Sequence, residues 1–340
     1  MNYKLLGKTG IKVSELCLGT MTFGTDWNFG SNKDESKRVY DTFVNAGGNF
    51  FDTANIYTTG TSEKYLGEFV KSERENLVIA SKYSLTESSK INLSGNSRKN
   101  MTQSIEGSLK RLGTDYIDLY YVHAWDFLVA PEELMRNLEY LLASGKILSI
   151  GISDTPAYIT SRCNTLAELR GWNQFAAYQV EYCLTEKTAD REIIPLCNHD
   201  DMTFCGFGPL AAGLLSGKYL EENNSDPKRM TKGVSPRLSD RNLAISAEIN
   251  KFSKEIGYTP SQVAIRWAMQ IVEKSSPIFG ARSLKQCEEN LKVLDFSLSD
   301  EQMARLNEIS KIGPNNPNDF LKLPRVEEIL YAGQKGKIIL

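Results

Sequence analysis

Eight short apolar runs rich in β-forming residues, each followed by a helical pattern, predict an α/β protein built as a single (β/α)8 barrel. The runs occupy residues 15–23, 49–54, 76–83, 116–124, 147–154, 175–182, 202–207 and 276–281. Several are continuously apolar, which is typical of parallel strands covered on both faces. An open, doubly wound sheet would give the same alternation, and the pattern alone does not separate the two.

Amphipathic segments supply the helical half of this pattern. Within residues 96–113, Met101, Ile105 and Leu112 fall on one helical face, and a glycine stops the helix. Leucines repeat this spacing within residues 131–146, which begin with proline and acidic residues. Both segments therefore predict helices that cover the barrel.

Three segments fall outside the alternation. We expect an N-terminal hairpin ahead of the barrel. Residues 217–242 are polar and proline-containing, which predicts a long loop after the seventh strand. Residues 311–340 begin rich in proline and asparagine and end apolar, so we expect an extra helix and an ordered tail packed on the barrel. Residues 1–340 are then one domain.

Composition excludes several classes of function. The chain has 340 residues, of which 41% are hydrophobic and 24% charged, and its formal net charge is −2. That charge gives no electrostatic reason to expect nucleic acid or an anionic membrane as a partner. No uninterrupted run of about 18 apolar residues occurs, so no membrane span is expected.

Cysteine and histidine usage points to a reducing compartment and away from metal. The six cysteines lack a CxxC pair and sit mostly in apolar stretches, which predicts reduced core thiols. The N-terminus lacks the apolar core of a secretion signal, and we therefore expect a cytoplasmic protein. Only two histidines are present, and no metal site is predicted. The string CNHDD at 197–201 is interpreted as a helix end.

Polar side chains gather where the predicted strands end. In a (β/α)8 barrel these ends converge on one mouth, where functional groups lie. Taken singly, each residue has an ordinary structural interpretation as a cap, a solvated charge or a core group. The candidates are Asp52, Tyr57, Lys82, His123, Ser153, Asp154 and Gln179.

Four of these residues form a chemically coherent set. A free tyrosine has a pKa of about 10, and a neighbouring ammonium such as Lys82 is expected to lower the pKa of Tyr57. Asp52 would keep Lys82 charged and oriented, and His123 could hydrogen-bond a substrate oxygen. This set suits proton transfer during interconversion of a carbonyl and an alcohol.

The string FDTANIYTTGTSEKYLG at 51–67 resembles the signature of the aldo-keto reductase superfamily, including its aryl-alcohol-dehydrogenase-like and potassium-channel-β-subunit-like branches. Further similar stretches are LGKTGIKVSELCLGTMTFG, GTDYIDLYYVHAWD, GKILSIGISD, GPLAAGLLSGKY and GARSLKQCEEN. The resemblance covers about residues 3–310. It implies a catalytic tetrad of Asp52, Tyr57, Lys82 and His123, with Tyr57 as general acid.

The resemblance also implies NADPH/NADP+ as cofactor and a small-molecule carbonyl substrate. It assigns the nicotinamide carboxamide to Gln179, Ser153 and Asp154, and the 2′-phosphate to Arg282; residues 217–242 would close over the cofactor. Relatives usually carry Asn in place of Asp154, and Tyr or Trp in place of Phe207. The full implied cofactor set is Gly19, Thr20, Met21, Ser153, Asp154, Gln179, Phe207, Pro209, Leu210, Leu215, Ser216, Gly217, Lys218, Gly280, Ala281, Arg282, Gln286, Glu289 and Asn290.

Loop aromatics predict an apolar substrate pocket. We expect Phe23, Trp27, Trp125 and Phe127 to line it together with Tyr57, which favours aromatic or medium aliphatic aldehydes over charged sugars.

The end that would hold the adenine has its own physical interpretation, because Ser283 and Gln286 match a capping box at a helix start beside an arginine.

Two alternatives stay open at this point, and one motif is set aside. An NADPH-binding regulatory subunit of low turnover would share the fold, although His123 favours an enzyme. A cofactor-free barrel could use Lys82 as a Schiff-base lysine. The string GFGPLA at 206–211 fits a loose dinucleotide fingerprint, but it contains a proline and has no βαβ context.

Overall fold

Eight parallel strands close into a barrel in the order β10-β3-β4-β5-β6-β7-β8-β9. The structure is a computed structural model and describes residues 1–220, 230 and 235–338. The closed order confirms the (β/α)8 prediction and excludes an open sheet. All eight predicted runs contain a barrel strand: β3 Cys17–Gly19, β4 Phe50–Asp52, β5 Val78–Tyr83, β6 Ile117–Val122, β7 Ile147–Ser153, β8 Ala177–Glu181, β9 Thr203–Phe207 and β10 Ile278–Gly280.

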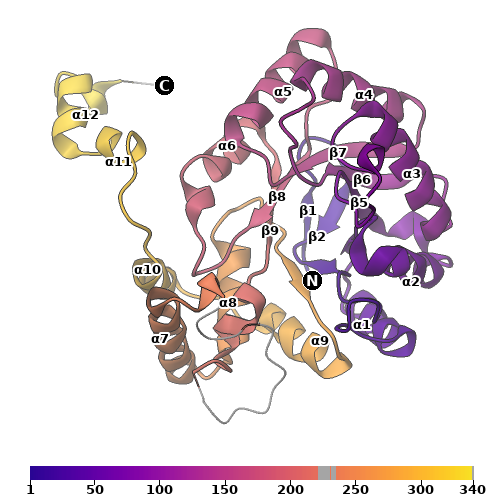
Figure 1. The fold of residues 1–340 in the computed structure, drawn as a ribbon. Coiled ribbons are helices and arrows are strands. Elements are labelled where there is room, and N and C mark those ends of the chain that lie inside the picture. The colour runs from indigo at the N-terminus through magenta and orange to yellow at the C-terminus, as the bar shows by residue number, and fades with distance from the viewer. Residues whose placement is uncertain (221–229, 231–234, 339–340) are drawn as a thin grey trace.

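Helices surround this barrel (Figure 1). They are α1 Lys33–Asn45, α2 Thr61–Val70, α3 Arg98–Leu112, α4 Pro131–Ala143, α5 Ala157–Arg170, α6 Ile193–Asp200, α7 Asp240–Ile256, α8 Pro260–Gln270, α9 Leu284–Leu291 and α10 Asp300–Ile309. The two helices expected from their apolar spacing are α3 and α4. Ser97 caps the start of α3 by accepting from the Asn100 N–H, and Gly113 ends it with a left-handed φ of 64°.

Side chains of each strand alternate between two apolar layers. Along β5, Val78 and Ala80 belong to the cluster inside the barrel, whereas Ile79 and Tyr83 belong to the cluster beneath the helices. This period of two sends Lys82 inward, and the side chain is completely buried. A charged group in such a place requires partners, and the site supplies them.

The predicted N-terminal hairpin forms and closes one end of the barrel. Strands β1 Tyr3–Leu5 and β2 Lys12–Ser14 pair antiparallel, outside the barrel sheet. The backbone N–H of Gly7 donates to Thr203 Oγ1 at 2.8 Å. Gly7 has a φ of +52°, and a Cβ there would lie 2.6 Å from the Ala176 carbonyl oxygen, so the close approach requires glycine. The opposite end, where the strands finish, stays accessible.

The C-terminal tail is helical, but the prediction that it packs on the barrel is wrong. It contains α11 Asn318–Leu321 and α12 Pro324–Leu330 and projects away from the barrel (Figure 1). None of the described residues 313–338 is buried. The tail is attached near its base, where Asn318 Nδ2 donates to the Arg191 carbonyl oxygen at 2.5 Å. Its apolar side chains, including Phe320 and Ile329, therefore remain exposed.

The polar segment 217–242 lies only partly within the described residues. Residues 221–229 and 231–234 fall outside them, so closure of this segment over a cofactor stays a prediction. Its last residues, from Asp240, form the first turn of α7 rather than loop. Ser239 caps that helix by accepting from the Asn242 N–H, a helix start that was not predicted from the sequence.

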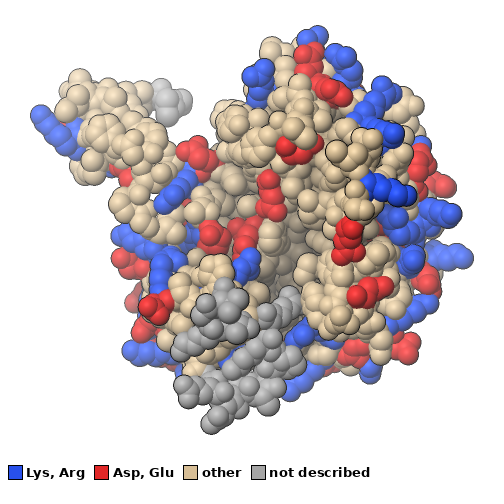
Figure 2. All heavy atoms as spheres, viewed as in Figure 1, with Lys and Arg blue, Asp and Glu red and all other residues tan. Residues whose placement is uncertain are grey.

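The surface and the cysteines have ordinary chemistry. Lysine, arginine and acidic side chains are interspersed on the visible face, mostly toward its rim (Figure 2). All six cysteines are free and buried, as expected for core thiols. Among the described residues no helix is long and apolar enough to cross a membrane.

Candidate active site

The strand ends bring a buried ion pair and its partners together at the barrel mouth. Lys82, near the end of β5, donates to Asp52 Oδ1 at 2.5 Å and to the Thr53 carbonyl oxygen at 2.9 Å. Its third donation goes to the Tyr57 hydroxyl at 3.1 Å. Gln179 Nε2 donates to Asp52 Oδ2 at 2.8 Å, so both carboxylate oxygens are satisfied. The ammonium likewise uses its three protons on three acceptors.

Tyr57 is presented by an unusual turn directly after β4. Thr58 and Thr59, which follow it in the 3₁₀ segment Tyr57–Gly60, have left-handed φ values of 46° and 55°. Such backbone is costly for β-branched residues and persists only where the surroundings impose it. Buried Thr58 supplies that constraint, because its hydroxyl donates to the Phe23 carbonyl oxygen at 2.7 Å and accepts from the Ser62 N–H at 3.0 Å.

Electrostatics keep Lys82 charged and Tyr57 protonated. Burial acts to lower the pKa of Lys82, but Asp52 and the Tyr57 hydroxyl reverse this, and the pKa is raised overall. Burial also raises the pKa of Tyr57 above its usual value, and the opposing effect of Lys82 does not cancel it. Lys82 does act to lower the pKa of Tyr57, as predicted, but burial outweighs this effect, so the pKa does not fall below its usual value as expected. At neutral pH the phenol retains its proton and can donate it.

His123 follows β6 and faces Tyr57 edge-on, with ring centroids 5.8 Å apart. Burial, and then the nearby charge of Lys82, hold its pKa well below 6.5. The imidazole is therefore neutral at neutral pH and carries one N–H donor and one lone pair. Its Nδ1 is buried without a partner among the described residues. A neutral histidine orients a polar group better than it donates a proton, which leaves Tyr57 as the proton donor.

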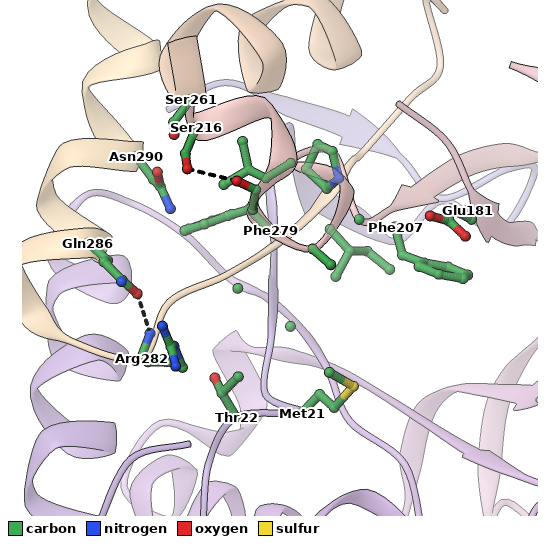
Figure 3. Close-up of a pocket in the computed structure, with 18 of the residues that line it drawn as sticks. Met21, Thr22, Glu181, Phe207, Ser216, Ser261, Phe279, Arg282, Gln286 and Asn290 are labelled. Atoms are coloured by element: carbon green, nitrogen blue, oxygen red, sulfur yellow. Dashed lines mark hydrogen bonds between the residues drawn. The ribbon is translucent and has the colours of Figure 1, made fainter. Parts of the chain in front are cut away.

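A cavity of about 1040 Å³ opens over this network. Asp52, Tyr57 and His123 line it, whereas Lys82 lies beneath the wall, completely buried. In the close-up, Phe207 and Glu181 lie on one side of the pocket, and Arg282 and Gln286 lie on the other (Figure 3). The cavity thus runs from the tetrad toward α9. Its volume is at the upper end of the range for ligand pockets.

The end near the tetrad carries polar groups suited to an amide. Ser153 lines the cavity, and its Oγ is buried with no partner in the part of the chain that the structure describes. Gln179 uses its amide nitrogen on Asp52, so its amide oxygen is the atom left for a ligand. Asp154 has a left-handed φ of 38°, and burial raises the pKa of its carboxyl despite the opposing effect of Lys82. Phe207 adds a flat apolar face.

The far end combines cationic side chains with helix starts. Lys218, Arg282 and Lys292 line the cavity, and Arg282 lies at this end beside Gln286 (Figure 3). Ser283 caps α9 by accepting from the Gln286 N–H. The full capping box is not formed, because the Gln286 side chain accepts at 3.0 Å from the Arg282 N–H, one residue early.

A carboxylate from another helix already occupies part of the α9 terminus. Glu35 of α1 accepts from the Leu284 N–H at 2.7 Å. The positive end of the α9 helix dipole is therefore partly compensated from within the chain. A phosphate placed here would therefore depend more on the Arg282 side chain than on the helix terminus.

Most predicted cofactor residues line this one cavity, and three do not. Thr20, Leu215 and Ala281 are buried and absent from its wall. Thr20 points into the scaffold, where its hydroxyl donates to the Asp52 carbonyl oxygen at 3.0 Å. The predicted residues that line the cavity are Gly19, Met21, Ser153, Asp154, Gln179, Phe207, Pro209, Leu210, Ser216, Gly217, Lys218, Gly280, Arg282, Gln286, Glu289 and Asn290.

Of the four aromatic residues expected beside Tyr57, the structure brings only Trp27 to the cavity wall. Phe23 is completely buried and packs edge-on against Phe69. Trp125 belongs to the core beneath the helices, and Phe127 is 68% exposed. An aromatic residue near a strand end can bury its ring in the core as well as in a pocket, so its residue type does not decide between the two.

Several lining residues were not predicted from the sequence. Ile56 and Leu85 lie in the loops after β4 and β5, within three residues of predicted site residues. Thr259 and Gln262 form a capping box at the start of α8, a readable signal for a helix N-terminus. Glu181 ends β8, two residues after Gln179, so the strand-end signal could have identified it. Arg237 and Asn250 gave no signal, because only the folded chain brings them to the cavity.

Two motifs that could suggest a Rossmann fingerprint or a metal site do not form one. GFGPLA ends β9 and enters the 3₁₀ segment Ala211–Ser216 instead of a long helix, so it is not a dinucleotide fingerprint. CNHDD ends α6, as expected. Within residues 1–220, 230 and 235–338, no group of three His, Cys, Asp or Glu side chains could hold a metal ion.

Comparison with known proteins gives consistent matches. Residues 15–311 match the profile described as the Aldo/keto reductase family. A norsolorinic acid reductase of Emericella nidulans is 36% identical over 323 residues, covering 92% of this chain and 82% of the relative. An aryl-alcohol dehydrogenase [NADP(+)] of Phanerodontia chrysosporium is 37% identical over 324 residues, covering 88% and 83%. A putative aryl-alcohol dehydrogenase of Saccharomyces cerevisiae is 32% identical over 334 residues, covering 94% and 89%.

Proposed function

Because the chain belongs to the aldo/keto reductase family, we propose that it reduces aldehydes or ketones to alcohols with NADPH and that Tyr57 is its proton donor. The protein is an NADP-dependent oxidoreductase at the family level. The observation that carries the finer assignment is the hydrogen bond between buried Lys82 and the Tyr57 hydroxyl, 3.1 Å long, at the cavity wall.

The cavity fits a nicotinamide dinucleotide phosphate. The buried Ser153 Oγ, which has no partner among the described residues, and the amide oxygen of Gln179 offer hydrogen bonds to a carboxamide. Phe207 offers an apolar face for the nicotinamide ring. At the other end Arg282 offers a guanidinium to a phosphate, assisted by Lys218. These residues all line the same cavity of about 1040 Å³.

In reduction, bound NADPH supplies the hydride that the carbonyl carbon accepts. Tyr57 transfers its phenolic proton to the carbonyl oxygen, which completes the alcohol. Lys82 stabilises the phenolate that remains, because its ammonium already donates to that oxygen. Asp52 keeps Lys82 charged, and neutral His123 orients the carbonyl by a hydrogen bond.

The Schiff-base alternative conflicts with the observed geometry. A nucleophilic lysine must be deprotonated and must reach the substrate carbon. Lys82 is completely buried, its pKa is raised, and its ammonium donates to Asp52, Thr53 and Tyr57. The arrangement suits a fixed charge that serves Tyr57.

The test is NADPH oxidation by the purified protein with a panel of aldehydes that includes 4-nitrobenzaldehyde, butanal and glucose, with the alcohol product identified. We expect turnover of the nitrobenzaldehyde and slower reduction of glucose. The relatives named above as aryl-alcohol dehydrogenases support an aromatic substrate. Tight NADPH binding with negligible turnover of every carbonyl would contradict the enzyme assignment and favour a regulatory subunit.

A further inference from the structure

We propose that Glu87 is a positioning residue that holds the Trp27 indole beside Tyr57, so that the indole forms one wall of the site for a flat, conjugated carbonyl substrate. The inference rests on the proposed function, since it takes Tyr57 as the proton donor. It concerns three loops at the mouth, which follow β3, β4 and β5 and contribute Trp27, Thr59 and Glu87 respectively.

Both oxygens of the Glu87 carboxylate are engaged across these loops. Oε1 accepts from Trp27 Nε1 at 2.7 Å, and Oε2 accepts from Thr59 Oγ1 at 2.9 Å. A hydrogen bond to a charged acceptor is stronger than a neutral one. The Thr59 contact fixes the direction of the carboxylate, and the carboxylate then fixes the edge of the indole that carries the N–H.

The indole that Glu87 holds forms part of the cavity wall where the substrate would bind. Trp27 lines the cavity, and its ring meets the Tyr57 ring edge-on, with centroids 6.4 Å apart and planes at 78°. Phe29 stacks near it, with ring centroids 6.2 Å apart. Trp27 therefore places an aromatic ring at the cavity wall, next to Tyr57.

The loop that carries Trp27 is built from turns. Gly24, Asn28 and Gly30 all have positive φ, which marks tight turns in place of regular strand or helix backbone. A neighbouring side chain of the loop is tied to the body by a longer hydrogen bond, 3.2 Å from Thr61 Oγ1 to Asp26 Oδ1. If Glu87 is removed, the Trp27 N–H loses the carboxylate that accepts from it, and the indole is free to turn away from the cavity.

Holding the indole in place should affect substrates differently according to their shape. A flat conjugated carbonyl gains from contact with the indole face, whereas a short aliphatic aldehyde is too small to use that wall. Tyr57 itself is fixed separately, through buried Thr58. Loss of Glu87 should therefore weaken binding of aromatic substrates without disturbing the proton donor.

The experiment compares Glu87→Ala, Trp27→Ala and the double variant, with 4-nitrobenzaldehyde and butanal as substrates. For Glu87→Ala we expect KM for 4-nitrobenzaldehyde to rise about fivefold, the factor that corresponds to one net hydrogen bond. The kcat, the KM for butanal and the dissociation constant of NADPH should stay unchanged. Because Glu87 acts through Trp27, adding Glu87→Ala to Trp27→Ala should produce no further rise.

The matched control is Glu106→Gln, which alters an exposed glutamate on α3 that pairs with Lys146 away from the cavity. A Glu87→Ala variant that behaves like this control with both substrates would overturn the proposal. So would additive effects in the double variant, or an equal loss of kcat for both substrates, since each would show that Glu87 does not act through the indole.

A second readout does not need turnover. The fluorescence of Trp27 is obtained as the difference between a protein that has Trp27 and its Trp27→Phe variant. This difference spectrum is measured with Glu87 present and with Glu87→Ala, and the two should differ if Glu87→Ala releases the indole. An unchanged difference spectrum would contradict the proposal even in a protein that reduces aldehydes rapidly. If the wild type reduced no carbonyl at all, the proposed function would fail, and the fluorescence would still decide whether Glu87 holds Trp27.

Discussion

Lys82 and Asp52 form an ion pair, 2.5 Å between Nζ and Oδ1, in which the lysine side chain is 0% and the aspartate side chain 4% exposed. Burying two charges is expensive, and such a pair does not by itself stabilise a fold. Here the pair holds a permanent positive charge against the Tyr57 hydroxyl at the end of the barrel. Burying this ion pair costs free energy of folding, but it places a positive charge where it assists proton transfer by Tyr57.

This ion pair predicts how the stabilities of two variants compare. Lys82→Met leaves the Asp52 carboxylate buried and unpaired, so we expect a loss of about 3–5 kcal/mol in the free energy of unfolding. The double variant Asp52→Asn with Lys82→Met removes both charges and should be more stable than Lys82→Met alone. Chemical denaturation measures the difference. A double variant less stable than the single one would show that charge pairing is not the main contribution of Asp52.

The low pKa of His123 predicts a loss of stability at acidic pH. In the unfolded chain histidine takes up a proton near pH 6.5, whereas buried His123 does so only well below that pH. Between these two values the unfolded state binds more protons, so stability falls as the pH falls, by about 1.4 kcal/mol per pH unit at most from this group.

His123→Asn removes this proton linkage and keeps a polar side chain. Comparing unfolding free energies of wild type and His123→Asn between neutral and mildly acidic pH isolates the contribution. The variant should lose less stability than the wild type as the pH falls. Parallel pH curves for the two proteins would mean that His123 is accessible to protons in the folded state.

The raised pKa of Tyr57 predicts the pH profile of reduction. The phenol must carry its proton to act as general acid, and burial raises its pKa above the usual value of about 10. We expect kcat/KM for aldehyde reduction to be flat through the neutral range and to fall only in alkaline solution. A fall already between neutrality and about pH 8 would indicate a different proton donor.

Arg282 should govern the choice between NADPH and NADH. Its guanidinium lines the cavity at the start of α9, where a 2′-phosphate would lie under the proposed function. We expect Arg282→Ala to raise KM for NADPH at least tenfold and to leave KM for NADH unchanged. A tenfold change corresponds to a loss of about 1.4 kcal/mol in binding free energy.

The control for this experiment lies three residues further along the chain, in α9. Lys285 is 83% exposed at its side chain and does not line the cavity, so Lys285→Ala removes a cation without removing a cavity contact. Equal effects of the two substitutions on NADPH would point to a general electrostatic field in place of a specific contact. Equal kcat/KM for NADPH and NADH in the wild type would contradict the preference itself.

The fold and the centre of the site were predictable because both follow strong local patterns. Apolar runs located all eight strands, and polar residues at strand ends located Asp52, Lys82 and His123, since parallel strands direct their ends to one mouth. The hydrogen bonds between Lys82, Asp52 and Tyr57 then follow from chemistry, because a buried ammonium requires acceptors.

The remaining features depend on packing that a single sequence does not express. Two nearby aromatic residues illustrate this, because Phe23 enters the core while Trp27 reaches the cavity from the same loop. The pKa of Tyr57 rises because burial outweighs Lys82, a balance that requires the folded environment. Glu35 reaches the start of α9 from α1, a contact between residues 249 positions apart.

The most direct measurement is the rate of NADPH oxidation with 4-nitrobenzaldehyde by wild type and Tyr57→Phe, together with the dissociation constant of NADPH for both. Phenylalanine keeps the ring and removes the proton, so we predict a loss of turnover of about 10²–10⁴-fold with NADPH binding retained. Turnover by Tyr57→Phe within a few-fold of wild type, with equal NADPH binding, would contradict the central claim that Tyr57 donates the proton.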